Sequence, residues 1–305
     1  MVLFGKNSLK MKDKALFINP ICLNKPRIHK RMNLKILKEI AKNINADILG
    51  LNTKSKQEFR EEIKKRSKDY DTFIFIGGDG TLSDGINSLY GMNKTIGIIP
   101  RGTGNANKYN LNLRYFKNRI CEIINREKTI KIDIMKINDE IYSLFSDVGY
   151  LSYIVEQRNN LNIKGQISYA ITLIQTLLTP KFYDTHAKNM YIYIDGKLIY
   201  EGKLLACIVS KTRFIGAGLQ FNPNAKLNDE QLHVALLNNR IFDIILKLPP
   251  SYLMKLPIFA PHFTGKKLTI LAEEPIPTQC DGEFNGHFNK ITYEVIPKAF
   301  NFIIG

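Results

Sequence analysis

The sequence has few of the residues that build zinc centres or disulfide frameworks. Its 305 residues include four cysteines and five histidines, and both kinds are scattered along the chain. The cysteines form no CxxC pair, so we interpret them as reduced thiols of an intracellular protein. No two histidines have the spacing of zinc ligands. The sequence therefore predicts neither a zinc site nor a set of disulfides.

Long hydrophobic runs are also missing. No apolar stretch approaches the roughly 20 residues that a membrane-spanning helix needs. The apolar run near the N-terminus, in MVLFGKNSLK, is too short for a secretory signal. We therefore expect a cytoplasmic protein whose contact with membranes is at most peripheral.

Acidic residues are outnumbered by basic ones. Asp and Glu total 28 and Lys and Arg total 44, which gives a net charge of +16. This balance favours an anionic partner such as nucleic acid, anionic lipid or a nucleotide, although a lysine-rich solvated surface explains many of the lysines equally well. The basic segments lack interleaved aromatic residues that would stack on bases. We therefore expect no specific nucleic-acid binding.

The first 130 residues alternate between strand-like and helix-like patterns. Short runs rich in Ile, Phe and Thr, such as TFIFI at 72–76 and TIGII at 95–99, are typical of strands buried in a parallel sheet. The segments between such runs carry apolar residues at helical spacing. Residues 1–130 are therefore predicted to form an α/β domain with helices on both faces of a parallel sheet.

From about residue 130 the pattern changes to many short strands with turn residues between them. Asp195-Gly196, between two such strands, is a hairpin signal. This pattern predicts an antiparallel second domain, a sandwich or barrel, over residues 131–296, with residues 297–305 as a candidate to pack back on the first domain. Two apolar segments interrupt the pattern, a helix candidate at 166–178 and a segment with four prolines at 241–263.

Two glycine-rich turns follow strands of the first domain, and each leads into a helical pattern. They are GGDGT at 77–81 and PRGTGN at 100–105. Glycine permits close backbone approach and positive φ, and a helix N-terminus offers free N–H groups to a phosphate. Asp79 adds a carboxylate, which indicates Mg²⁺ bridging phosphate oxygens or a base acting on a hydroxyl. Turns that merely start helices would need neither this aspartate nor both glycine sets.

An ordered set of four motifs resembles the diacylglycerol kinase-type lipid kinases, which include sphingosine and ceramide kinases and bacterial lipid kinases. The motifs are Asn-Pro after the first strand, GGDGT, P-x-GTGN and Asp-Gly-Glu near the C-terminus. The resemblance covers nearly the whole chain. It implies a nucleotide-binding α/β domain, a C-terminal antiparallel β-sandwich domain, and a cleft between them. In that cleft, with Mg²⁺, the γ-phosphoryl group of ATP would pass to a hydroxyl of a diacylglycerol- or sphingoid-type lipid.

The resemblance also implies roles for individual residues. Asp79 and Asp281 are both candidates for the catalytic general base, and the sequence does not choose between them. Asp84 stands where the family usually has glutamate. The positions that match nucleotide contacts are Asn19, Thr53, Gly77, Gly78, Gly80, Thr81, Asp84, Gly102, Thr103, Gly104, Asn105 and Glu283. The positions that match metal sites are Asp79, Asp133 and Asp229.

Three of these aspartates have a plain structural alternative. Asp133 matches an aspartate of the family's metal–water network, but it also suits an exposed charge on a strand. Asp229 resembles the aspartate that binds a structural Mg²⁺ in some bacterial members. Because Glu230 replaces the glycine of that element, an ordinary surface turn fits Asp229 as well. Asp281-Gly282 likewise fits a simple hairpin turn.

The lipid acceptor stays open. Ala106 follows GTGN where diacylglycerol-type bacterial members usually have aspartate, and GTGNA resembles the sphingosine kinase branch. That branch receives the sphingoid amine with acidic residues, but the matching positions lie near Tyr153 and Val155, which are not acidic. The segments 166–178 and 241–263 suit a lipid gate and contact with an anionic membrane surface, or a cover for the second sheet.

Two other functions use some of the same motifs. An NAD kinase-like enzyme also carries GGDGT, but its pattern lacks P-x-GTGN and the Asp-Gly-Glu ending. A non-catalytic nucleotide-binding module would not need the retained Asp79, Asp133, Asp281 and Glu283. A homodimer is a further option that the sequence does not decide. The lipid kinase is the prediction that uses all four motifs.

Overall fold

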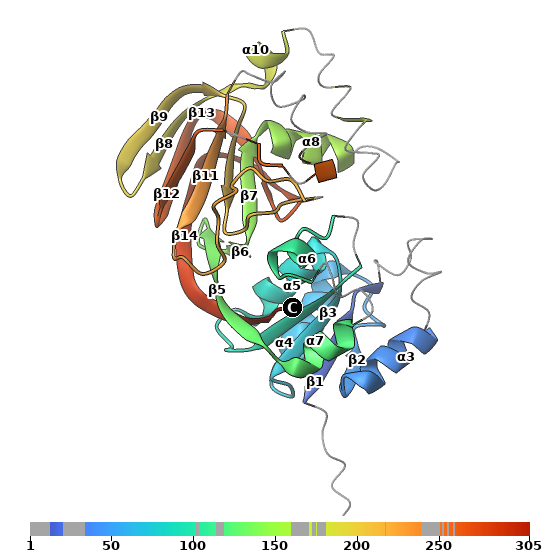
Figure 1. Cartoon of the computed structure of the whole chain (residues 1–305). Helices are drawn as coiled ribbons and strands as arrows, with labels where there is room; N and C mark the ends of the chain where they lie inside the picture. Colours follow the sequence, from blue (N-terminus) through green and yellow to red (C-terminus); the bar gives the residue numbers. More distant parts are fainter. Residues whose placement is uncertain are drawn as a thin grey trace, which may run out of the picture.

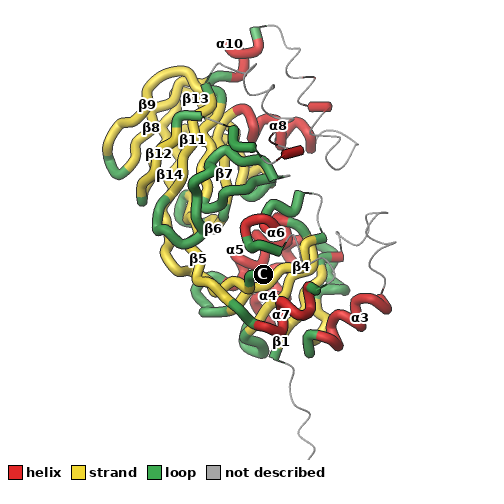
Figure 2. Tube along the Cα trace, in the orientation of Figure 1, coloured by secondary structure: helices red, strands yellow, loops and turns green. Residues whose placement is uncertain are grey.

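Two domains, one α/β and one β, are joined by long strands that run between them (Figure 1). The computed structural model describes residues 13–20, 34–101, 104–113, 119–159, 171–172, 175, 181–216, 218–238, 251, 253–254, 256–258 and 260–305. Figure 2 shows the strands continuing from one domain into the other. All pairings below refer to these described residues.

Parallel strands form the centre of the first domain in the order β4-β3-β1-β2. Their side chains are mostly buried, as expected for a parallel sheet that is covered on both faces. The strands are β1 (Lys14–Ile18), β2 (Ala46–Leu49), β3 (Thr72–Gly77) and β4 (Thr95–Pro100).

The helices of the first domain lie on both faces of this sheet. The chain moves one way along the sheet from β1 to β2 and the other way from β2 through β3 to β4. Right-handed crossovers therefore place α3 (Leu34–Asn43) on one face and α4 (Lys56–Arg66) and α5 (Asp79–Leu89) on the other. Two shorter helices, α6 (Asn107–Asn110) and α7 (Ile120–Arg126), follow. The predicted α/β arrangement is confirmed.

Two long strands connect the domains. β5 (Thr129–Ile137) and β14 (Glu283–Ile303) pair antiparallel, and the end of β14 also pairs in parallel with β4 through Asn301 and Phe302. The C-terminal strand, red in Figure 1, therefore begins in the second domain and ends inside the sheet of the first.

The second domain is antiparallel, as predicted, and forms a β-sandwich. Its strands follow the order β12-β11-β10-β7-β13-β14, and β8 joins β13 to β9. Two helices accompany it: α8 (Tyr150–Asn159) lies beside the strands, and α10 (Phe182–His186) lies at the top of the domain in Figure 1. The remaining strands are β6 (Ile141–Ser143), β7 (Phe145–Gly149), β8 (Lys188–Ile194), β9 (Lys197–Leu204), β10 (Ala206–Ser210), β11 (Leu232–Leu237), β12 (His262–Gly265) and β13 (Lys267–Cys280).

Two tight hairpins have the same turn geometry. Asp195-Gly196 joins β8 to β9 with φ of 50° and 80°, which confirms the predicted hairpin. Asp281-Gly282 joins β13 to β14 with φ of 50° and 86°. Positive φ at both central residues is typical of type I′ turns, which match the twist of the flanking strands. Asp281 is therefore a hairpin residue as well as a candidate catalytic one.

Most of the two apolar segments falls outside the described residues. Of 166–178, only 171–172 and 175 are described, and of 241–263 the described residues are 251, 253–254, 256–258 and 260–263. Within the described part of the chain, no helix combines the length and apolarity that crossing a membrane requires.

Candidate active site

Three neighbouring strands of the first domain deliver the predicted phosphate-binding residues to one edge of the sheet. Ile18 pairs with Ile76 and Gly77 pairs with Pro100. The segments that follow these strands therefore meet at their carboxyl ends, which is where open α/β sheets bind ligands. They include the buried Asn19, GGDGT and the described part of PRGTGN. Gly102 and Thr103 lie outside the described residues.

Asp79 fastens the second glycine turn to the first. As the first residue of α5, it accepts hydrogen bonds from the N–H of Ala106 (3.1 Å) and Asn107 (3.2 Å) and from Nδ2 of Asn107 (3.0 Å). Burial raises the pKa of the Asp79 carboxyl, and these hydrogen bonds oppose the rise. A Cβ on Gly104 would lie 2.9 Å from the carbonyl oxygen of Gly216 and 3.2 Å from Oδ2 of Asp79. Only glycine allows this approach.

Asp281 brings a second carboxylate from the other domain. Its Oδ1 accepts hydrogen bonds from the N–H of Leu144 (3.3 Å) and Phe145 (3.1 Å). Its buried Oδ2 has no hydrogen-bond partner of ordinary geometry among the described residues.

The pKa of Asp281 rises to about 7. Burial is the main cause, repulsion from Asp79 adds to it, and the hydroxyls of Ser83 and Ser143 oppose it. A carboxylate that is close to half-protonated at neutral pH has the property expected of a general base.

Two basic residues of α4 face the acidic residues of this site. Asp84 of α5 is buried, and it pairs with Nε of Arg60 at 2.6 Å and with Nζ of Lys56 at 3.5 Å. Lys56 also forms an ion pair with Glu283 at the start of β14. Burial lowers the pKa of Lys56, whereas Asp84 and Asp281 raise it. Lys56 therefore connects the two domains beside the predicted nucleotide site.

The sequence analysis did not single out Lys56 and Arg60, because their helix is so charged that it suits an exposed surface helix. A usable signal is their spacing. Positions four apart share one helix face, and Phe59, next to Arg60, is fully buried. Two further predicted residues lie nearby. A Cβ on Gly80 would be 3.5 Å from Oε1 of Glu283, and the buried side chain of Thr81 fills the space beside Gly77.

Arg101 is another basic residue that the motifs did not single out. It occupies the variable position of P-x-GTGN, and its backbone N–H donates to the carbonyl oxygen of Gly77 at 2.7 Å. Its buried Nε has no hydrogen-bond partner among the described residues. A basic residue inside the second glycine turn is the signal that could have found it.

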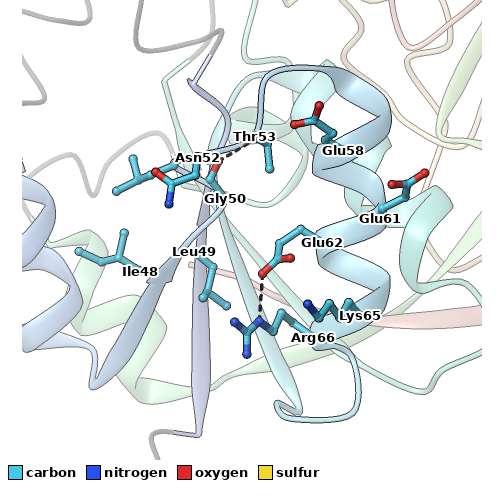
Figure 3. A pocket seen from close by; sticks show the side chains of 11 residues that line it. Ile48, Leu49, Gly50, Asn52, Thr53, Glu58, Glu61, Glu62, Lys65 and Arg66 are labelled. Carbon is cyan, nitrogen blue, oxygen red and sulfur yellow. Dashed lines mark hydrogen bonds and ion pairs between the residues drawn. The ribbon is translucent and has the colours of Figure 1, made fainter.

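Thr53 lines a hollow beside β2 and α4 (Figure 3). Its hydroxyl donates to the carbonyl oxygen of Gly50 at 2.8 Å. Three glutamates and only two basic side chains surround the hollow, and one ion pair joins Arg66 to Glu62 at 3.0 Å. None of the described residues of the glycine turns lines it. An acidic hollow repels phosphate, so a contact of Thr53 with a nucleotide stays a prediction.

A buried chain of hydrogen bonds supports the Asp-Gly-Glu turn. Asp147 of β7 accepts from Oγ of Ser152 at 2.8 Å and from Nε2 of Gln279. Oε1 of Gln279 in turn accepts from the N–H of Gly282 at 2.7 Å. Burial raises the pKa of Asp147 to about 7, and the hydrogen bonds from Gln279 and Ser152 oppose the rise. The glutamine two residues before Asp281 was the available sequence signal for this support.

Asp133 and Asp229 form a separate group. Both carboxylates contact Nζ of the buried Lys211, at 3.1 Å and 2.7 Å. No interaction described here links them to Asp79 or Asp281. Across the described residues, no three His, Cys, Asp or Glu side chains are grouped closely enough to hold a metal ion by themselves. The metal roles of Asp79, Asp133 and Asp229 stay predictions.

Comparison with known proteins shows which family the chain belongs to. Residues 16–137 match the diacylglycerol kinase catalytic domain, and residues 147–304 match the YegS C-terminal NAD kinase β-sandwich-like domain. The chain belongs to the diacylglycerol kinase catalytic-domain family. The chain is therefore a member of a kinase family, and the predicted resemblance to the diacylglycerol kinase-type enzymes is confirmed.

Individual relatives agree with this assignment. A Staphylococcus aureus protein (strain MSSA476) described as a candidate lipid kinase is 27% identical over 256 residues, which cover 81% of this chain and 82% of that protein. The crystal structure of a diacylglycerol kinase from Bacillus anthracis strain Sterne superposes with a TM-score of 0.75. It is 23% identical and covers 97% of this chain and 98% of its own. At 23% identity, this similarity shows a shared fold and nothing beyond it.

Proposed function

We propose that this family member is an ATP-dependent kinase that phosphorylates a hydroxyl group of a diacylglycerol- or sphingoid-type lipid with Mg²⁺. The observation that carries the proposal is the pair Asp79 and Asp281. One carboxylate lies within the glycine turns and the other arrives from the second domain, close enough to repel it. The alternative of a non-catalytic module gives no reason to bring the carboxylate of Asp281 from the second domain close enough to Asp79 for the two to repel each other.

We assign the general base to Asp281, because its raised pKa suits proton transfer near neutral pH. In the proposed reaction, the acceptor oxygen forms a bond to the γ-phosphorus of ATP while the bond to the β–γ bridging oxygen breaks. The hydroxyl proton moves to Asp281, and ADP leaves. The N–H groups of the glycine turns hold the phosphates, and Arg101 supplies a further donor from its unpartnered Nε.

The carboxylates of the cleft fit a Mg²⁺ ion that completes its shell with phosphate oxygens and water, since Asp79 and Asp281 alone supply too few ligands. When bound, such an ion would neutralise charge that develops on the phosphates. Asp79 is the residue proposed to hold it. The three hydrogen bonds to Asp79 fix the direction in which its oxygens point.

The decisive assay measures Mg²⁺-dependent transfer of labelled γ-phosphate into an extractable lipid, with the phosphorylated acceptors identified by mass spectrometry. Diacylglycerol, sphingosine and ceramide form the acceptor panel, and NAD serves as the competing acceptor. We expect label in a lipid and none in NAD. Label in NAD alone, or none in any acceptor while ATP still binds, would contradict the proposal.

A kinase of bilayer lipids also needs a surface that meets the membrane. Leu253, Met254 and Leu256 are 75%, 70% and 45% exposed, which is unusual for large apolar side chains. We propose that they enter an anionic membrane surface, helped by the net charge of +16. The protein should sediment with anionic vesicles at low salt and less at high salt.

The matching variant replaces Leu253 and Met254 with serine, and we expect it to bind vesicles about tenfold more weakly. The matched control replaces Leu198 of β9, an apolar side chain that is 41% exposed and lies outside this segment, with serine. Equal sedimentation of the variant, the control and the wild-type protein would remove these residues from the proposed membrane contact.

A further inference from the structure

Lys211 is a fully buried lysine whose ammonium group is completely satisfied. It follows β10 and is 0% exposed. Its Nζ contacts Oδ2 of Asp133 at 3.1 Å, Oδ1 of Asp229 at 2.7 Å and the carbonyl oxygen of Gln231. An ammonium group has three N–H donors, and three oxygens surround it here. Lysines are rarely buried unless they are paired in this way.

The three oxygens form a set that would otherwise suit a divalent cation. Two carboxylates from different segments and one main-chain carbonyl are typical ligands of Mg²⁺ or Ca²⁺. The family resemblance placed metal-linked roles at Asp133 and Asp229. The observed spacing of 2.7–3.1 Å between nitrogen and oxygen is that of charge-assisted hydrogen bonds. An ammonium and a metal ion cannot occupy the same position, so these residues do not fit a metal here.

The backbone beside Lys211 orients Asp133 and includes one residue with positive φ. Glu230 has a φ of 57°, so it adopts the left-handed conformation that the family's glycine favours at this position. Its N–H donates to Oδ2 of Asp133 at 2.7 Å, and the N–H of Lys298 donates to Oδ1 at 3.0 Å. The turn is therefore retained although its glycine is lost.

Further hydrogen bonds satisfy both carboxylate oxygens of Asp229. Oδ2 of Asp229 pairs with Nε2 of His233 at 2.7 Å, and the N–H of Gln231 donates to Oδ1 of Asp229 at 3.2 Å. Burial lowers the pKa of His233 although Asp229 raises it. The network joins β5, β10, the turn before β11 and β14, where the two domains are connected. A fixed cation at this place would stabilise the same elements that a bound metal would.

We propose that the ammonium group of Lys211 replaces a structural divalent cation in this chain, so that the second domain folds without a metal. The proposal is independent of the proposed lipid kinase activity and of the acceptor, because it concerns folding alone. It predicts that the wild-type protein contains no tightly bound divalent ion and that removing Lys211 creates a demand for one.

The first experiment uses the wild-type chain. Its metal content is measured by inductively coupled plasma mass spectrometry, and its thermal unfolding is followed with EDTA, MgCl₂ or CaCl₂. We expect no stoichiometric metal and a Tm that changes by less than about 2 °C. The same scans on Asp79→Asn, which removes the carboxylate proposed to hold a cation in the cleft, exclude that cation as the source of any shift. A bound divalent ion, or a large loss of Tm in EDTA, would overturn the proposal.

The second experiment removes the ammonium group of Lys211 by substitution. Lys211→Ala should lower the Tm in EDTA by about 10 °C, because it leaves the buried carboxylate of Asp133 and the half-buried carboxylate of Asp229 without the ammonium group. Ca²⁺ or Mg²⁺ should restore most of that loss. Lys211→Met fills the same space with an apolar chain, so it should lose stability without recovery. Lys188→Ala, which removes an exposed pair with Glu274, should change little in any buffer.

A more conservative variant guards against a failure to fold. Lys211→Gln keeps a donor for Asp229 but removes the charge, and calorimetric titration with Ca²⁺ then reads cation binding directly. We expect binding by Lys211→Gln or Lys211→Ala and none by the wild-type protein or by Lys188→Ala. If neither Lys211 variant gains Ca²⁺ binding or stability from cations, Lys211 does not stand in for a metal.

Discussion

Two groups of aspartates in this molecule solve the problem of buried negative charge in opposite ways. Around Lys211, the carboxylates of Asp133 and Asp229 meet an internal cation, and hydrogen bonds satisfy their oxygens. In the cleft, the half-buried Asp281 lies near Asp79, and burial of its carboxyl together with repulsion from Asp79 raises its pKa. The first group is built for stability. In the second group, the raised pKa of Asp281 is the property that a proton acceptor requires.

The difference has a thermodynamic consequence at Asp281. Its pKa is about 7 when folded, whereas an unfolded aspartate titrates near 3.9. Between these values the folded state holds more protons than the unfolded state. The contribution of Asp281 to stability therefore falls as pH rises from about 4 to about 7, by on the order of 4 kcal/mol in total. Asp281 therefore lowers the stability of the folded protein at neutral pH, where its raised pKa suits proton transfer.

The largest expected effect comes from Asp281→Asn. We expect kcat/KM for lipid phosphorylation to fall by roughly 10³-fold, because the variant cannot accept the proton. The free energy of unfolding at pH 8 should rise by roughly 2 kcal/mol, because the buried charge is gone. Steady-state kinetics and urea unfolding measure both effects. A variant that loses stability together with activity would place Asp281 with the structural group instead.

The opposite result is expected for Asp133→Asn. Removing this carboxylate leaves Lys211 partly unpaired in the interior, which should lower the free energy of unfolding by roughly 3 kcal/mol. Urea unfolding at neutral pH is the measurement. Asp139→Asn is the matched control, because its pair with Lys136 is exposed to solvent and should contribute nothing measurable. Equal stability of the two variants would contradict the structural role of the Lys211 network.

The pH dependence of activity should follow the titration of Asp281 in the cleft and not that of the aspartates around Lys211. Since the pKa of Asp281 is about 7, kcat/KM should fall about tenfold for each pH unit below 7 and level off above it. The wild-type free energy of unfolding should decrease between pH 5 and pH 8, and this slope should be smaller in Asp281→Asn. Rates measured from pH 5 to pH 9 give the profile. A flat profile below pH 7 would rule out proton transfer to this carboxylate.

The sequence predicted the fold and the family, because both depend on local patterns. Apolar strand runs separated by helical patterns predicted the parallel sheet of the first domain, and the four ordered motifs predicted the family. The network around Lys211 could not be predicted in this way. Nothing near Lys211 distinguishes it from the many surface lysines, and its burial depends on Asp133 and Asp229, which are brought together only by the fold. Lys56 and Arg60 differ in part, because their spacing of four places them on one helix face, although only the fold shows that this face meets Asp84.

The smallest effect concerns the support of the Asp-Gly-Glu turn. Gln279→Leu removes the donor to Asp147 and the acceptor for the N–H of Gly282, so the turn that carries Asp281 should become less well positioned. We expect kcat to fall about tenfold while KM for ATP stays within about twofold, because misplacement affects the reacting groups more than nucleotide binding. The pKa of Asp147 should rise further without its hydrogen bond from Gln279. Cys280→Ser, beside the same turn, is a control that keeps both hydrogen bonds. If KM rises while kcat is unchanged, Gln279 acts on nucleotide binding and not on the placement of Asp281.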